Sequence, residues 1–120
     1  MAEIHETGKT GEQIASKYLE QKGYQVLETN WQSGHQEIDI IARKDDLLII
    51  AEVKTRRTRF FGEPEEFVTR TKQRLLIKAA NQYLIRNELD LEVRFDIVSV
   101  LLQGERHQVS HIEDAFYPTL

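Results

Sequence analysis

The chain has 120 residues, of which 40% are apolar, and this length suits one domain with one hydrophobic core. It contains no cysteine, which excludes disulfides and thiolate metal sites. The first residues are polar and charged, and no apolar run reaches the length needed to span a membrane. We therefore expect a cytoplasmic protein without a membrane partner, formed by a single domain over residues 1–120 with a polar N-terminal tail over about residues 1–7.

The net charge of −4 is distributed unevenly along the sequence. Residues 54–86 contain nine Lys or Arg and three acidic residues, a net charge of +6, so the rest of the chain carries −10. This basic segment predicts a surface that faces phosphate, although solvated helix and loop charges would give the same count. The residues predicted to contact nucleic acid are Arg56, Arg57, Arg59, Lys72 and Arg74.

The first half of the chain predicts one helix followed by three strands. An apolar stripe with a period of 3.6 residues predicts a helix over residues 8–22, which Gly23 ends. The next segments are short, apolar and bounded by turn residues, and the last two form a hairpin through the turn at residues 44–46. These strands are expected over residues 24–31, 36–42 and 47–55.

The second half predicts a helix followed by two strands. Gly62 and Pro64 indicate a loop over residues 56–64, and helical periodicity follows over residues 69–87. A tail from residue 115 is expected to pack back through two aromatic side chains. The element order α-β-β-β-α-β-β predicts an α/β fold with a central mixed sheet flanked by helices. The last two strands are expected over residues 91–102 and 108–112, and the aromatic residues of the tail are Phe116 and Tyr117.

Charged side chains interrupt the most apolar strands of the chain. Glu52 and Lys54 lie in the strand over residues 47–55, where burial of a charge is costly unless it is paired or bound to a metal. Because strand side chains alternate between faces, Glu52 and Lys54 share one face, and Glu37 and Asp39 share a face of the preceding strand. The hairpin therefore predicts that Asp39 approaches Glu52.

Two converging carboxylates without a nearby thiol are typical of a site for a hard cation. Mg²⁺ (or Mn²⁺) prefers oxygen ligands, and the carbonyl of Val53 could supply one more. Lys54 would then orient the attacking water or neutralise charge that develops on a phosphate. The alternatives are a structural ion pair between Glu52 and Lys54, or an exposed sheet face. Asp39 could begin a turn and Glu37 could be solvated.

A second charged pair, Arg94 and Asp96, also lies two residues apart in an apolar strand. Here a salt bridge that stabilises the sheet is the favoured interpretation, and a role in the site is the alternative.

Asp39 followed by Glu52-Val53-Lys54 resembles the D…(D/E)xK signature of the restriction-endonuclease-like superfamily. Over about residues 8–115 the chain further resembles the YraN-like family of small bacterial proteins, which is similar to archaeal Holliday-junction resolvases. The usual Gly before Glu37 is replaced by Gln36, which affects the expected loop shape more than the site. The residues that carry the resemblance are Gly11-Glu12, Ala15, Tyr18-Leu19, Gly23-Tyr24, Asn30-Trp31, Glu37-Ile38-Asp39, Glu52-Val53-Lys54-Thr55-Arg56, Lys72, Ala79-Ala80, Tyr83-Leu84 and Arg94-Phe95-Asp96.

The resemblance implies a restriction-endonuclease-like core and assigns roles to four residues. Asp39 and Glu52 would be metal ligands, Lys54 the catalytic lysine, and Glu12 the first-helix acid that reaches the site. Without the resemblance, Glu12 is an ordinary acid in the first turn of a helix, favourable to the helix dipole. Glu37 is expected to be an auxiliary site residue.

The function expected from these residues is Mg²⁺-dependent hydrolysis of nucleic-acid phosphodiesters, selective for the structure of its DNA. DNA is favoured over RNA, and a homodimer is expected by analogy with resolvases. The alternative is a nucleic-acid-binding module that cleaves nothing and acts with a partner protein.

Overall fold

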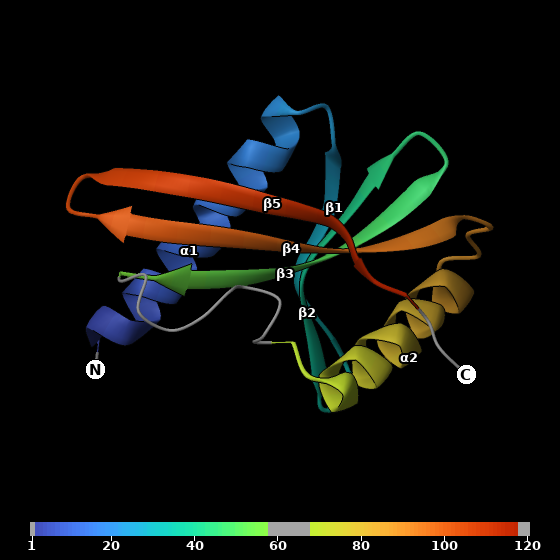
Figure 1. Cartoon of the computed structure of the whole chain (residues 1–120). Coiled ribbons are helices and arrows are strands. Elements are labelled where there is room, and N and C mark those ends of the chain that lie inside the picture. The colour runs from blue at the N-terminus through green and yellow to red at the C-terminus, as the bar shows by residue number, and fades with distance from the viewer. Residues whose placement is uncertain (1, 58–67, 118–120) are drawn as a thin grey trace.

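The computed structural model describes the backbone of residues 2–57 and 68–117 and the side chains from residue 10 onward. Within these residues, five strands form one mixed sheet in which the strands follow the chain order, and two helices pack against it (Figure 1). The predicted α/β class and the order α-β-β-β-α-β-β are confirmed. The elements are α1 (Ala2–Gln21), β1 (Gln25–Ser33), β2 (Gln36–Lys44), β3 (Leu47–Arg56), α2 (Arg70–Arg86), β4 (Glu92–Gln103) and β5 (Arg106–Phe116).

Two elements extend well beyond their predicted bounds, and the other boundaries agree to within two residues. Helix α1 begins at Ala2, so most of the expected polar tail is helical, and β5 spans Arg106–Phe116 instead of five residues. Phe116 lies inside β5 and stacks on Phe95 with ring centroids 4.9 Å apart, whereas Tyr117 is 64% exposed. Only one of the two tail aromatics therefore packs on the core. Most of the expected loop over residues 56–64 lies outside the described residues.

The two helices pack against opposite faces of the sheet. Because side chains alternate along β3, this strand contributes to the core under each helix. Leu48 and Ile50 belong to a core cluster under α2, while Ile49 and Ala51 belong to a second cluster under α1. Strands β3 and β4 are parallel, and α2 lies in the connection between them (Figure 1). Strand β3 is thus central and covered on both faces. Among the described residues, no helix is long and apolar enough to cross a membrane.

Strands β2 and β3 separate at Asp39. They pair from Lys44 and Leu47 only as far as Ile40 and Ala51, whereas β1 stays paired with β2 to its first residue. Strand β3 remains paired with β4 beyond this point, to its last residue. The backbone N–H of Val53 donates to Asp39 Oδ2 at 2.8 Å. The separation leaves room for side chains between the two strands, and the predicted site residues lie at this point.

Helix α1 crosses β3 at Gly11. A Cβ atom at Gly11 would lie 1.7 Å from Thr55 Oγ1, so only glycine allows the helix to approach this closely. Because Glu12 follows directly, the close crossing sets how far its side chain extends toward the separated strands.

Candidate functional site

A cleft of about 260 Å³ lies where β2 and β3 separate. Its polar lining is formed by three carboxylates and two lysines from four different elements. The predicted residues Glu12, Asp39, Glu52 and Lys54 therefore meet in one cavity. The cleft is lined by Glu12, Asp39, Glu52, Val53, Lys54, Val68, Lys72 and Ile97.

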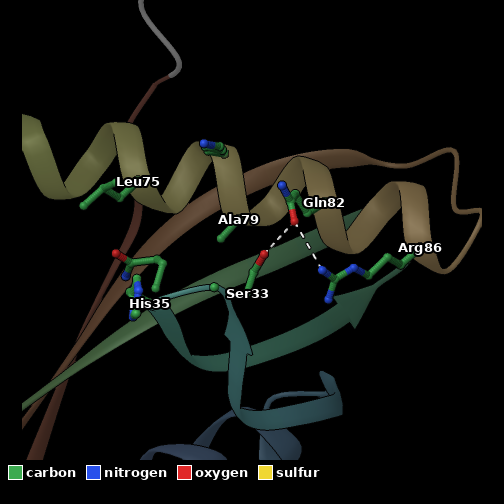
Figure 2. A pocket seen from close by; sticks show the side chains of 9 residues that line it. Ser33, His35, Leu75, Ala79, Gln82 and Arg86 are labelled. Carbon is green, nitrogen blue, oxygen red and sulfur yellow. Dashed lines mark hydrogen bonds between the residues drawn. The ribbon is translucent and has the colours of Figure 1, made fainter.

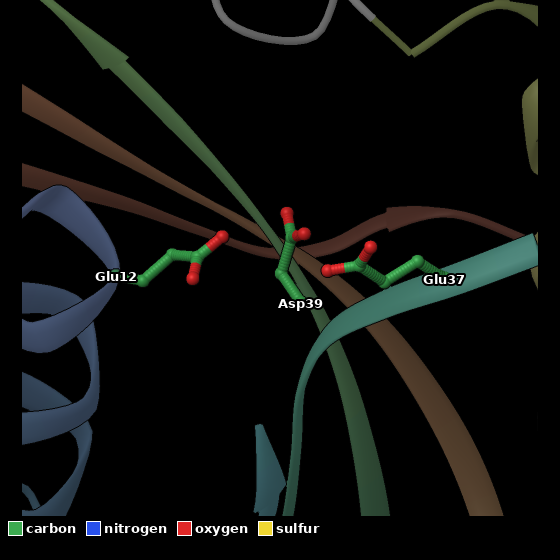
Figure 3. Close-up of side chains that lie close together, drawn as sticks. All are labelled: Glu12, Glu37 and Asp39. Atoms are coloured by element: carbon green, nitrogen blue, oxygen red, sulfur yellow. The ribbon is translucent and has the colours of Figure 1, made fainter. Parts of the chain in front are cut away.

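Three carboxylates, one from α1 and two from β2, converge at Asp39 (Figure 3). One carboxylate oxygen each of Glu12, Glu37 and Asp39 lies within 4.8 Å of the others, with Asp39 in the middle (Figure 3). Opposite oxygens around Mg²⁺ at about 2.1 Å lie about 4.2 Å apart, so small side-chain movements would bring these oxygens into one coordination shell. The structure thus brings Glu37, the predicted auxiliary residue, next to Asp39 and Glu12.

Glu52 lies deeper and is only 6% exposed. Its Oε2 atom is 2.9 Å from Lys72 Nζ. Its Oε1 atom is buried and has no hydrogen-bond partner among the described residues. A buried carboxylate oxygen without a donor is costly, and a cation in the cleft would satisfy it.

The acidic side chains raise one another's pKa values. Burial, together with the charge of Asp39, raises the pKa of Glu52 to about 7, although Lys72 opposes this shift. Burial also raises the pKa of Asp39 against the lowering effect of the Val53 N–H. The pKa of Glu12 is raised by burial and by the charges of Asp39 and Glu37, which outweigh a hydrogen bond from Asn30. Perturbed carboxylates in a cleft are typical of functional sites.

Lys72, which the sequence predicted to contact nucleic acid, also contributes to the cleft. Its ammonium group lies against Glu52 while its side chain is 43% exposed, so contact with nucleic acid stays a prediction. Burial lowers the pKa of Lys72, yet its hydrogen bond to Glu52 and the nearby charges outweigh this and raise it. A sequence signal existed, because the first turn of α2 contains no acid and a cation there opposes the helix dipole.

Asn30 is a second residue that sequence reasoning missed as part of the site. Its side chain hydrogen-bonds to Glu12, and its backbone adopts the left-handed conformation with φ of 52°. Asn tolerates this conformation better than most residues. Asn30 therefore orients the acid that α1 supplies. The resemblance included Asn30 but gave it no role.

The remaining predicted residues are more dispersed. Val53 contributes its N–H to Asp39, while a role for its carbonyl stays a prediction. Arg57 and Arg74 are exposed, and Arg57 lines a separate hollow beside Thr10 and His107. Arg56 is half-buried, and Arg59 lies outside the described residues. Arg56, Arg57 and Arg74 thus do not line the cleft, and their contact with nucleic acid stays a prediction.

The chemistry of the lining fits a divalent cation. Every charged ligand in the cleft is a carboxylate, which suits the hard cations Mg²⁺ and Mn²⁺. The unsatisfied Oε1 of Glu52 adds an acceptor that no side chain of the described residues serves. Glu12, Glu37, Asp39 and Glu52 are the residues that would hold the cation.

The fold and the cleft together define a small α/β protein with a carboxylate-lined site at a split in its central sheet. The chain belongs to the group described as "Uncharacterised protein family UPF0102", whose sequence profile matches residues 11–100. This is the YraN-like family that the sequence predicted.

Similar proteins cover nearly the whole chain. It is 50% identical over 117 residues to the UPF0102 protein FP2501 of Flavobacterium psychrophilum, covering 98% of both chains. It is 44% identical over 120 residues to a UPF0102 protein of Bacteroides thetaiotaomicron, covering 100% of this chain and 99% of the relative.

Proposed function

We propose that this protein is a Mg²⁺-dependent nuclease that hydrolyses nucleic-acid phosphodiesters, with branched or distorted DNA as its substrate. The observation that carries the proposal is the cleft at the split between β2 and β3. Three carboxylates and two lysines line it, Glu37 lies beside Asp39, and Glu52 Oε1 is buried without a donor among the described residues. The element order and the Asp39…Glu52-Val53-Lys54 spacing support a restriction-endonuclease-like core.

The side chains of the cleft divide into two groups. The acids would hold a divalent cation, which when bound stabilises negative charge on phosphate and makes water a better nucleophile. Asp39 is fixed in place by the Val53 N–H, so its carboxylate is preorganised. Glu12 is held by its hydrogen bond with Asn30, so this acid is also oriented.

The two lysines would act on the phosphate. Lys54 follows Glu52 by two residues and lines the same cleft. We assign to Lys54 the orientation of the attacking water and neutralisation of the phosphate. Lys72 approaches from α2, and its side chain is 43% exposed, so it can reach a phosphate at the mouth of the cleft.

The test is cleavage of a labelled panel of single-stranded, duplex, flap and four-way-junction DNA, together with RNA, in Mg²⁺ or Mn²⁺. We expect metal-dependent cutting that falls by about 10²-fold or more in Lys54→Ala and Asp39→Asn, because each removes a group that acts on transition-state charge. Arg43→Ala, at the far end of β2, is the matched control and should cut like wild type. If well-folded wild type cuts no member of the panel, the nuclease proposal is wrong.

A second candidate is a nucleic-acid-binding module that does not cleave. The ion pair between Lys72 and Glu52 favours it, because the protein itself supplies a cation to the most buried acid of the cleft. This candidate predicts salt-sensitive DNA binding that survives Asp39→Asn, without cutting by wild type. It also predicts that Mg²⁺ leaves the melting temperature unchanged.

A further inference from the structure

A hollow of about 560 Å³ lies between α2 and the β1–β2 turn (Figure 2). We call it the α2 hollow and define it by Ser33, His35, Leu75, Lys78, Gln82 and Arg86. Ser33 donates to Gln82 Oε1 at 2.7 Å, and this bond joins the strand side to the helix side (Figure 2). A polar contact of the protein itself therefore spans the two walls of the hollow.

The α2 hollow adjoins the acidic cleft on both of its walls. On the strand side, Gln36 lines the hollow and the next residue, Glu37, belongs to the carboxylate cluster. On the helix side, Leu75 follows Lys72 by three residues, which places the two on neighbouring turns of one face. A ligand that leaves the cleft along α2 would enter the hollow.

The chemistry of the hollow fits an anionic ligand with an aromatic or apolar part. None of the described residues that line it is acidic, although acids outnumber bases in the chain, 20 to 16. Lys78 and Arg86 supply two cations from the same helix. Leu75 is 45% exposed and offers apolar surface, while Gln82 offers hydrogen bonds.

The single tryptophan of the chain lies beside this hollow. The guanidinium carbon of Arg86 is 5.5 Å from the centre of the Trp31 ring, and that ring packs edge-on against Tyr83 at 5.1 Å. A phosphate that binds Arg86 would change the surroundings of the indole. Trp31 fluorescence therefore reports binding in the hollow.

We propose that the α2 hollow binds unpaired nucleotides of the nucleic-acid strand that passes through the acidic cleft. The proposal rests on the proposed function and narrows its substrate to nucleic acid with a single-stranded segment. The volume lies in the range of small-ligand pockets, about 300–1,000 Å³, and suits individual nucleotides rather than a duplex. Lys78 and Arg86 bind the phosphates, and Leu75 packs against a base or sugar.

Binding in the absence of metal tests the proposal separately from cleavage. Labelled dT8, its RNA counterpart rU8 and an eight-base-pair duplex are titrated with protein in EDTA over a range of salt concentrations. For dT8 we expect Lys78→Ala/Arg86→Ala to weaken binding about tenfold and to reduce the slope of log K against log salt by about 1.4, or about 0.7 for each lost phosphate contact. The control Lys22→Ala/Arg43→Ala also removes two cations, at the opposite end of β2, and should bind as wild type does.

Trp31 emission locates the ligand. We expect dT8 to change the emission of wild type, the duplex to change it much less, and Lys78→Ala to shift the dT8 midpoint to higher concentration. Comparison of dT8 with rU8 shows which of the two nucleic acids the hollow prefers. Circular dichroism confirms that each variant is folded.

The outcomes separate this proposal from the nuclease. If dT8 binds through the α2 hollow but wild type cuts nothing, the single-strand site holds and the nuclease fails. The hollow proposal is overturned if the double variant binds dT8 as wild type does, or if the duplex changes Trp31 emission as strongly as dT8. Either result would mean that the hollow is not a site for unpaired nucleotides, whatever the cleavage panel shows.

Discussion

Two buried carboxylates, Asp96 and Glu52, lie one residue out of register on neighbouring strands, yet they differ in how many hydrogen-bond donors surround them. Asp96 of β4 is directly beside Ala51 of β3, so Glu52 is the next residue along. Asp96 is fully buried and Glu52 is 6% exposed. Because side chains alternate along strands, Asp96 faces α1 and Glu52 faces α2.

Both carboxylate oxygens of Asp96 are hydrogen-bonded. Arg94 donates from Nε and from one terminal nitrogen, each at 2.9 Å, and the N–H of Asp114 donates at 3.1 Å. His111 Nε2 lies 2.7 Å from Oδ2. Burial alone would raise the pKa of Asp96, but these partners outweigh it and lower it. The contacts agree with the stabilising salt bridge that the sequence favoured for Arg94 and Asp96.

Glu52 has Lys72 and the backbone N–H of Asp39 as partners, and one of its oxygens has no donor among the described residues. Burial and the charge of Asp39 raise its pKa to about 7 instead of lowering it. The comparison teaches that burial of a charge does not by itself distinguish a structural site from a functional one. The number of donors around each oxygen does distinguish them, because an unsatisfied acceptor beside a cavity is available to a ligand.

The largest expected effect on stability comes from removing the charge of the fully hydrogen-bonded Asp96. Asp96→Asn removes the charge that holds Arg94 and His111, and breaking a buried pair typically costs about 3–5 kcal/mol. We expect the free energy of unfolding, measured with urea, to fall by this amount. Asp45→Asn is the control, because Asp45 lies in an exposed turn with φ of 55° that Asn tolerates. A loss below about 1 kcal/mol would show that the Asp96 network is not structural.

Removal of the charge of Glu52, whose Oε1 lacks a donor among the described residues, should instead increase the free energy of unfolding. The folded protein holds the Glu52 proton more tightly than the unfolded chain, since its pKa rises from 4.5 to about 7. Its stabilising contribution is complete below pH 4.5 and is lost as the pH rises through about 7. Glu52→Gln cannot lose this proton, so in EDTA it should gain about 2–3 kcal/mol over wild type between pH 5 and pH 8.

Urea denaturation at both pH values measures this difference. Glu20→Gln, at an exposed position of α1, is the control and should follow wild type. If the free energy of unfolding depends on pH in the same way in wild type and in Glu52→Gln, the pKa of Glu52 is not raised. Glu52 would then be as fully hydrogen-bonded as Asp96.

The smallest expected effect concerns the close crossing of α1 and β3, which positions Glu12 at the cleft. In Gly11→Ala the added Cβ meets Thr55 Oγ1, so the helix must move away from β3. Such overpacking typically costs about 1–3 kcal/mol. Glu12 moves with the helix, so we also expect metal-dependent cutting to weaken.

A double-mutant cycle attributes the effect to this contact. Thr55→Ala removes the nearest atom and should restore part of the stability that Gly11→Ala loses. Ser16→Ala on the same helix is the control. A Gly11→Ala variant as stable as wild type would mean that the close crossing does not position Glu12.

The sequence predicted the fold well where burial imposes a period. Helix α2 buries one apolar face, and β2, β3 and β4 contain long buried apolar runs. These elements were therefore predicted to within a few residues. Strand β5 is mostly exposed along its length and gives little alternation, so only its middle was predicted.

The site was predictable only in part. Asp39 and Glu52 were found because charges in apolar strands are costly and because a hairpin places its strands side by side. Glu12 came from the family resemblance. Lys72 reaches Glu52 across 20 positions of sequence, and no local pattern shows that a helix places its first turn over a particular strand residue. Their roles in catalysis stay predictions.

The parallel pairing of β3 with β4 has a consequence for how the chain folds. Strands β1, β2 and β3 form neighbouring antiparallel pairs, whereas β4 pairs with β3 only after the connection that contains α2 has closed. Contacts between residues close in sequence form before those that require a long loop to close. We therefore expect Asp39 and Glu52 to come together early and Lys72 to arrive late, so an incompletely folded chain would present an acidic cleft that still lacks its helix-borne lysine.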